Sequence, residues 1–140
     1  MLVLAGCGLR IPADPDGTLD RITGGQLRVG AATVDLPGAK PGDPASGPLG
    51  EVIEEFAETR EADIVWTTGG EEELVEQLEA GELDLAVGDM TDQTPWADRV
   101  SVTRGYEIAG SQKKFVVLLP LGENALQSAL EVFLDDRMSP

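Results

Sequence analysis

The alternation of short apolar segments with amphipathic ones between residues 26 and 87 constrains the fold of this chain more than any other feature. Residues 26–33, 62–67 and 83–87 are rich in Leu, Val, Ile, Ala or Trp over lengths typical of strands. Between them, residues 49–59 and 71–80 carry apolar side chains at the spacing of one helix face. This order of strand, helix, strand, helix and strand predicts right-handed crossovers and a parallel sheet.

The remainder of the chain predicts further elements of the same domain. Residues 89–98 are irregular, residues 99–102 allow a short strand, and residues 113–119 predict a strong one. Residues 124–135 predict an amphipathic closing helix. A chain of 140 residues has room for one ordinary domain. We therefore predict an α/β fold, a three-layer sandwich with a mostly parallel central sheet, over residues 26–137.

Charge and composition oppose several classes of function. The formal net charge of −16 and the lack of a basic cluster oppose binding to nucleic acid or to anionic lipid surfaces. The chain has no histidine, and its single cysteine can form neither an internal disulfide nor a thiolate cluster. The commonest general base, the histidine-dependent nucleophile pairs and the usual zinc ligands are therefore missing. We expect a protein that is not an enzyme and that needs no metal or cofactor.

Residues 1–7, MLVLAGC, resemble the end of a bacterial lipoprotein signal peptide. In that class a small-residue tripeptide precedes a cysteine that becomes lipidated, so the resemblance implies a lipid anchor on Cys7. Residues 8–25 are polar and turn-rich, as a tether should be, so residues 1–25 are predicted to be a signal remnant and tether. No apolar run reaches the roughly 18 residues of a membrane span. The resemblance implies an extracytoplasmic lipoprotein held at the membrane by its anchor only; the alternative is an apolar strand with a buried Cys7 thiol.

Three segments of the chain resemble the type 2 periplasmic solute-binding proteins of extracellular family 3, which serve amino-acid transporters. They are residues 26–30 (QLRVG), residues 51–57 (EVIEEFA) and, most specifically, residues 78–91 (LEAGELDLAVGDMT), in which a glycine ends a helix before a central strand. Members of that family trap the ligand between two lobes, whereas residues 105–112 here pass directly to the returning strand. The resemblance implies a single lobe that binds a small solute for a membrane transporter. A homodimer or a partner protein would supply the missing second lobe.

Two departures from the family pattern bear on the solute. The family's amino-acid binders place an arginine that grips the ligand carboxylate where Trp96 stands in this chain. They also place an aromatic side chain after the first strand, where Leu36 and Pro37 stand here. Both departures favour an alternative function, a degenerate single-lobe interaction module that contacts a membrane or envelope protein without capturing a solute.

Physical reasoning alone locates a candidate site, because ligands of open parallel sheets bind beyond the carboxyl ends of the strands. The residues predicted there are Thr33, Asp35, Thr68, Gly69, Asp89, Met90, Thr91 and Trp96. Structural interpretations stay open beside this one: the acids and Thr68 as loop, turn or cap residues, and Trp96 as a side chain that packs over a loop. Three glutamates at residues 71–73 should cancel the attraction of a helix N-terminus for anions. We therefore expect a cationic or amine-bearing solute.

Overall fold

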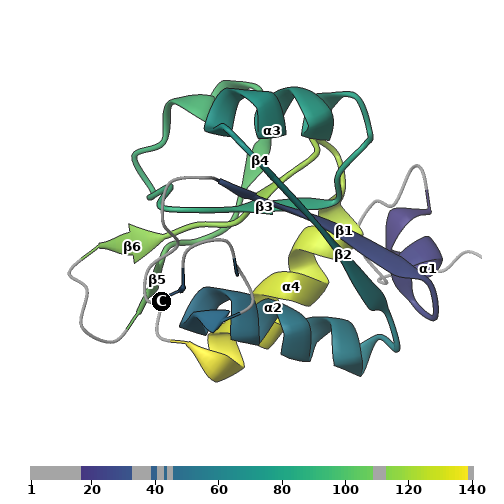
Figure 1. Cartoon of the computed structure of the whole chain (residues 1–140). Coiled ribbons are helices and arrows are strands. Elements are labelled where there is room, and N and C mark those ends of the chain that lie inside the picture. Colours follow the sequence, from purple (N-terminus) through teal and green to yellow (C-terminus); the bar gives the residue numbers. More distant parts are fainter. Residues whose placement is uncertain (1–16, 33–38, 41–42, 44–45, 109–112, 139–140) are drawn as a thin grey trace, which may run out of the picture.

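The computed structural model describes residues 17–32, 39–40, 43, 46–108 and 113–138 (Figure 1). Its helices are α1 (Thr18–Ile22), α2 (Pro48–Thr59), α3 (Glu71–Glu79) and α4 (Asn124–Arg137), together with a short 3-10 helix, η2 (Pro95–Asp98). Its strands are β1 (Gln26–Ala32), β2 (Asp63–Gly69), β3 (Leu85–Val87), β4 (Ser101–Val102), β5 (Tyr106–Glu107), β6 (Lys114–Phe115) and β7 (Leu118–Leu119). The predicted order of strand, helix, strand, helix and strand is confirmed by β1 to β3 and the helices between them.

The central sheet has the strand order β2-β1-β3-β7-β4. Strand β1 pairs in parallel with β2 on one side and with β3 on the other. Strand β7 runs antiparallel to both β3 and β4, so β4 points the same way as β1. The sheet is therefore mostly parallel, as predicted, and a separate antiparallel pair, β5-β6, lies beside it.

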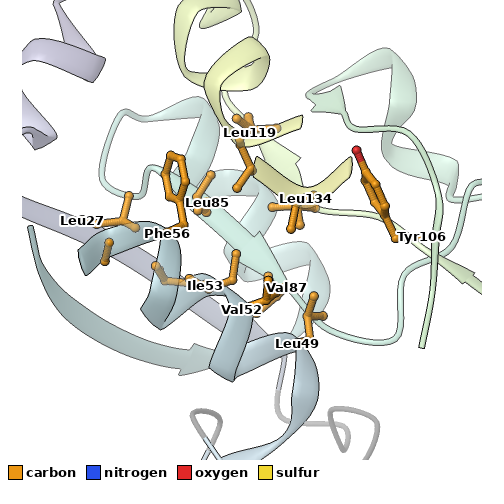
Figure 2. Packing of buried hydrophobic residues seen from close by; sticks show 14 of the residues in the cluster. Leu27, Leu49, Val52, Ile53, Phe56, Leu85, Val87, Tyr106, Leu119 and Leu134 are labelled. Atoms are coloured by element: carbon orange, nitrogen blue, oxygen red, sulfur yellow. The ribbon is translucent and has the colours of Figure 1, made fainter. Parts of the chain in front are cut away.

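Two apolar clusters hold the layers together, one on each face of the sheet. In β3, Leu85 and Val87 join the cluster formed with α2 and α4, whereas Ala86 between them joins the cluster formed with α3. This alternation is the two-residue period of a strand covered on both faces. Phe56 of α2 and Phe133 of α4 also meet edge to face, with ring centroids 5.6 Å apart. Figure 1 shows α3 on one face of the sheet and α2 and α4 on the other, and Figure 2 shows the first cluster, so the three-layer architecture is confirmed.

Two glycines fix how α3 packs. A Cβ atom on Gly30 of β1 would lie 2.7 Å from side-chain carbons of Leu74 and Leu83, so the bare glycine lets α3 approach the sheet closely. Gly81 follows α3 with a φ of +75°, a left-handed conformation that glycine adopts without strain. The helix ends there, as the sequence predicts.

Helix α1 belongs to the folded lobe, although it lies within residues 1–25. Its Ile22 side chain is fully buried in the cluster shared with α2 and α4. The described structure of the lobe therefore begins before Gln26, with α1 packed against it. Residues 1–16, with Cys7, lie outside the described residues. In the part of the chain that the structure describes, no helix combines the length and apolarity that a bilayer crossing requires.

The prediction of a single strand over residues 113–119 is wrong. The segment divides into β6, which pairs with β5, and β7, which pairs with β3 and β4. Between them, the Val116 N–H donates to the Met90 carbonyl (3.1 Å) and the Val117 N–H donates to the Thr103 hydroxyl oxygen (2.9 Å). Because these loop groups take the hydrogen bonds of the middle residues, the segment passes from one sheet to the other.

Candidate functional site

The three parallel strands end level with one another. Ala31 of β1 lies opposite Thr68 of β2 on one side and opposite Val87 of β3 on the other. The connections that leave β2 and β3 therefore start on either side of the end of β1. We call this end of the sheet the carboxyl edge. It brings Thr68 and Gly69 to one flank and Asp89 to the other, which is the arrangement that the strand order predicts.

The β2 flank of the carboxyl edge is strongly acidic. Thr68 is exposed, and Gly69 is buried, with a Cβ at its position only 3.3 Å from the carboxyl carbon of Glu73. Gly70 is the N-cap of α3 and offers no side chain to cap the helix. All three residues of the first turn are glutamates, so their charges oppose the positive end of the helix dipole. This flank is better suited to a cation than to an anion.

The β3 flank combines one accessible acid with packed residues. The Asp89 side chain is half-buried. The Met90 side chain is buried in the cluster beneath α3, and its carbonyl accepts the Val116 N–H. Thr91 forms an isolated bridge with Phe115 and accepts a long hydrogen bond from the Gln93 N–H (3.4 Å). Of these predicted residues, Asp89 is therefore the best placed to meet a solute with its side chain.

Trp96 joins the loop after β3 to the start of α3. Its indole Nε1–H donates to Glu71 Oε1 at 2.7 Å, and its ring packs against the cluster beneath α3. The Arg99 guanidinium lies 5.5 Å from the ring centroid. These contacts fit the packing interpretation of Trp96, while its contact with a solute stays a prediction. Thr33 and Asp35, also predicted for this site, lie outside the described residues.

The arginines of the described chain all have partners. Each contacts a carboxylate or an aromatic ring: Arg21 and Arg28 contact Asp84, Arg60 the Phe56 ring, Arg99 Glu79, Arg104 Asp135, and Arg137 Glu55. All six described arginines therefore already contact groups of the protein itself. Among the same residues, no group of three or more acidic or cysteine side chains is placed to hold a metal ion.

A hydrogen-bonded group ties β5 to α4. The buried Tyr106 hydroxyl donates to Asp135 Oδ1 at 2.7 Å, and the Arg104 Nη2 donates to Asp135 Oδ2 at 2.6 Å. Burial is the main cause that raises the pKa of Tyr106, and the hydrogen bond to Asp135 raises it further. The hydrogen bond from the Tyr106 hydroxyl is the main cause that lowers the pKa of the Asp135 carboxyl, and the hydrogen bond from Arg104 lowers it further. Tyr106 is therefore a packing residue with a hydrogen-bonded hydroxyl.

A cavity of about 580 Å³ lies at the opposite end of the sheet. Its wall includes Arg28 near the start of β1, Asp84 just before β3, Arg21 of α1 and Arg99 after η2. We call it the amino-edge cavity. Sequence reasoning missed the cavity, because Arg21 and Arg28 meet Asp84 only through the fold, across at least 56 residues of chain. One of them, Arg21, lies in the stretch predicted as a tether.

Comparisons with known proteins give the fold a precedent. No family model matches the sequence, and no curated protein does. Among solved structures, the arginine-bound form of domain 1 of TmArgBP has a TM-score of 0.70 and 18% identity, over 84% of this chain and 97% of that one. A single-substitution variant of the same domain, also arginine-bound, has a TM-score of 0.71 and 19% identity, over 85% of this chain and 97% of that one. The chain therefore has the fold of this arginine-bound domain, a single lobe with a mostly parallel central sheet.

Proposed function

We propose that this chain is a solute-binding lobe that holds a small cationic or amine-bearing solute at the carboxyl edge. The observation that carries the proposal is the level ending of β1, β2 and β3, which sets Thr68 and Asp89 on the two flanks of Ala31. Thr33 and Asp35, which follow β1 in the sequence, would complete the site from its centre. Open parallel sheets bind their ligands at such an edge.

The charges at the carboxyl edge support a cation as the solute. Asp89 and the three glutamates of the first turn of α3 stand on the two flanks, while every described arginine is already engaged. An ammonium or guanidinium group would therefore meet several carboxylates close together, whereas an anion would be repelled. That domain 1 of TmArgBP has an arginine-bound form supports the idea that one lobe suffices to hold such a solute.

The proposal includes the cellular setting that the sequence suggests. Cys7 would carry a lipid, residues between it and α1 would serve as a tether, and the lobe would act outside the cytoplasm beside a membrane transporter. Metabolic labelling with a fatty-acid analogue tests the anchor. Incorporation that disappears in Cys7→Ser supports it, and equal labelling of both proteins contradicts it.

Isothermal titration calorimetry of the whole chain tests the solute proposal. L-arginine should bind more tightly than L-glutamate, and Asp89→Asn should weaken arginine binding about fivefold or more because one close charge is lost. Asp63→Asn is the matched control, since Asp63 is an exposed acid at the other end of β2. Binding of glutamate in place of arginine, or an equal effect of the two substitutions, would contradict the proposal.

A second function, an interaction module without solute capture, is favoured by one observation. Two residues of the predicted site are engaged within the protein: Met90 lies in the cluster beneath α3, and the Trp96 indole donates to Glu71. This alternative predicts no heat with arginine, lysine or glutamate. It also predicts that proximity labelling in cells marks one envelope protein, and that Thr68→Arg at the carboxyl edge abolishes this labelling.

A further inference from the structure

We propose that the amino-edge cavity is a second ligand site, which binds a small organic carboxylate. The site is distinct from the carboxyl edge, since the cavity lies where β1 and β3 begin and where α3 ends. It rests on cavity geometry and charge and does not depend on the proposed function of the carboxyl edge. Three features carry it: oriented donors, a local charge balance and an apolar wall.

The first feature is a pair of guanidinium groups fixed by one buried acid. The Asp84 side chain is only 2% exposed; its Oδ1 accepts from Arg21 Nη2 (2.5 Å) and Arg28 Nη2 (3.0 Å), and its Oδ2 accepts from the backbone N–H and the Nε of Arg28. Arg21 also donates from Nη1 to the Gln26 carbonyl. Each guanidinium thus uses two of its five N–H donors in these bonds. The two groups line the cavity with donors to spare, in the planar geometry that carboxylates match.

The second feature is the charge of the wall. Three of the ten basic residues of the chain, Arg21, Arg28 and Arg99, line this cavity, against three of its 26 acidic residues, Glu79, Asp84 and Glu123. The wall is formally neutral in a chain whose net charge is −16. The charge of Asp84 is screened by the four donors around it, and Glu79 binds Arg99. An anion therefore meets far less repulsion here than the net charge of the chain would suggest.

The third feature is apolar surface beside the arginines. Leu78 and Leu83 are buried side chains of the wall, and Leu121 reaches solvent with 62% of its surface exposed. A cavity of about 580 Å³ has room for a molecule of several carbon atoms. An aliphatic chain can lie against the half-buried Pro120 and the exposed Leu121 of the wall while its carboxylate meets the guanidinium pair. An inorganic oxyanion has no aliphatic chain, so it would contact only the guanidinium pair.

A titration of the ¹⁵N-labelled 140-residue chain with hexanoate, followed by amide chemical shifts, tests the inference. Hexanoate should shift the amides around Gly81, Leu83 and Asp84, and inorganic phosphate should bind more weakly. Leu121→Glu adds a negative charge where Leu121 lines the cavity and should weaken hexanoate binding about threefold, the effect of one charge roughly 6 Å away in a largely aqueous setting. Val132→Glu is the matched control, because Val132 is an equally exposed aliphatic side chain on α4 (71%) outside the cavity wall.

Each contrary outcome overturns a defined part of the inference. Unshifted amides at the cavity would remove the site, and phosphate binding as tight as hexanoate would remove the organic class of ligand. Equal weakening by Leu121→Glu and Val132→Glu would reduce the effect to the net charge of the chain. Asp89→Asn at the carboxyl edge should leave hexanoate binding unchanged, so failure of this site is separable from failure of the proposed function.

Discussion

Asp84→Asn should destabilise the lobe far more than the same substitution at Asp89. The two acids flank β3, one before it and one after it, and each change removes one negative charge. Asp84 is buried and accepts four hydrogen bonds, three of them from the guanidinium groups of Arg21 and Arg28. Asparagine would keep one oxygen acceptor and would replace the other with an amide N–H₂ group. That group cannot accept the hydrogen bonds that the arginines donate.

The magnitude follows from the burial of each partner. Breaking a buried ion pair by removing one member costs about 3–5 kcal/mol. The side chains of Arg21 and Arg28 are 43% and 33% exposed, so water can solvate them again, and we discount the loss to about 2–3 kcal/mol. With a urea m-value of about 1.5 kcal/mol/M for a domain of this size, the unfolding midpoint should fall by about 1.3–2 M.

Urea unfolding followed by circular dichroism measures this difference. Asp89→Asn should change the free energy of unfolding by no more than about 0.5 kcal/mol, because Asp89 is only half-buried at the rim. Equal midpoints for the two variants would refute the assignment of Asp84 as the acid that joins α1, β1 and β3.

Three further outcomes follow from local geometry. Gly30→Ala should cost about 1–3 kcal/mol, because its methyl group would lie 2.7 Å from two leucine side chains, and an unchanged urea midpoint would contradict that packing. Gly70→Ser should be neutral or slightly stabilising in the same assay, because no atom lies within 4 Å of the new Cβ and serine caps a helix well; a clear loss would show the N-cap to be misplaced. Tyr106 is the only tyrosine, so ultraviolet absorbance reports its ionisation alone. Burial and the hydrogen bond to Asp135 raise its pKa above the ordinary value near 10, so the stability it contributes is fully present below pH 10 and is lost as the pH rises through the raised pKa. Phenolate should therefore form only well above pH 10, and ionisation near pH 10 in the folded protein would be the contrary result.

The sequence predicts the elements whose pattern is local. The apolar runs of β1 and β3 and the periodic faces of α2 and α4 give their type and approximate bounds, and Gly81 marks the end of α3. The level strand ends also follow from the sequence, because two consecutive parallel connections bring successive carboxyl ends to one edge. The polar flanks of the carboxyl edge could therefore be predicted, although which side chains remain accessible could not: Met90 proves to be a packing residue.

The features that the sequence does not predict depend on contacts between distant residues. The break between β6 and β7 arises because the Thr103 hydroxyl takes the Val117 N–H, and no local pattern announces that bond. The amino-edge cavity depends in the same way on the fold, which brings Arg21 and Arg28 to Asp84 and Arg99, far away in the sequence. Arg21 lies in a polar stretch whose composition indicates a tether. That composition gives no sign that Arg21 binds the buried Asp84.

The most direct test of the proposed solute site is an amide chemical-shift map of the ¹⁵N-labelled chain titrated with L-arginine. We expect saturable shifts of the amides of Thr68, Gly69 and Asp89, together with those of Thr33 and Asp35. Shifts confined to the amino-edge cavity, or none at all at solubility-limited arginine, would contradict the claim that the carboxyl ends of these strands bind the solute.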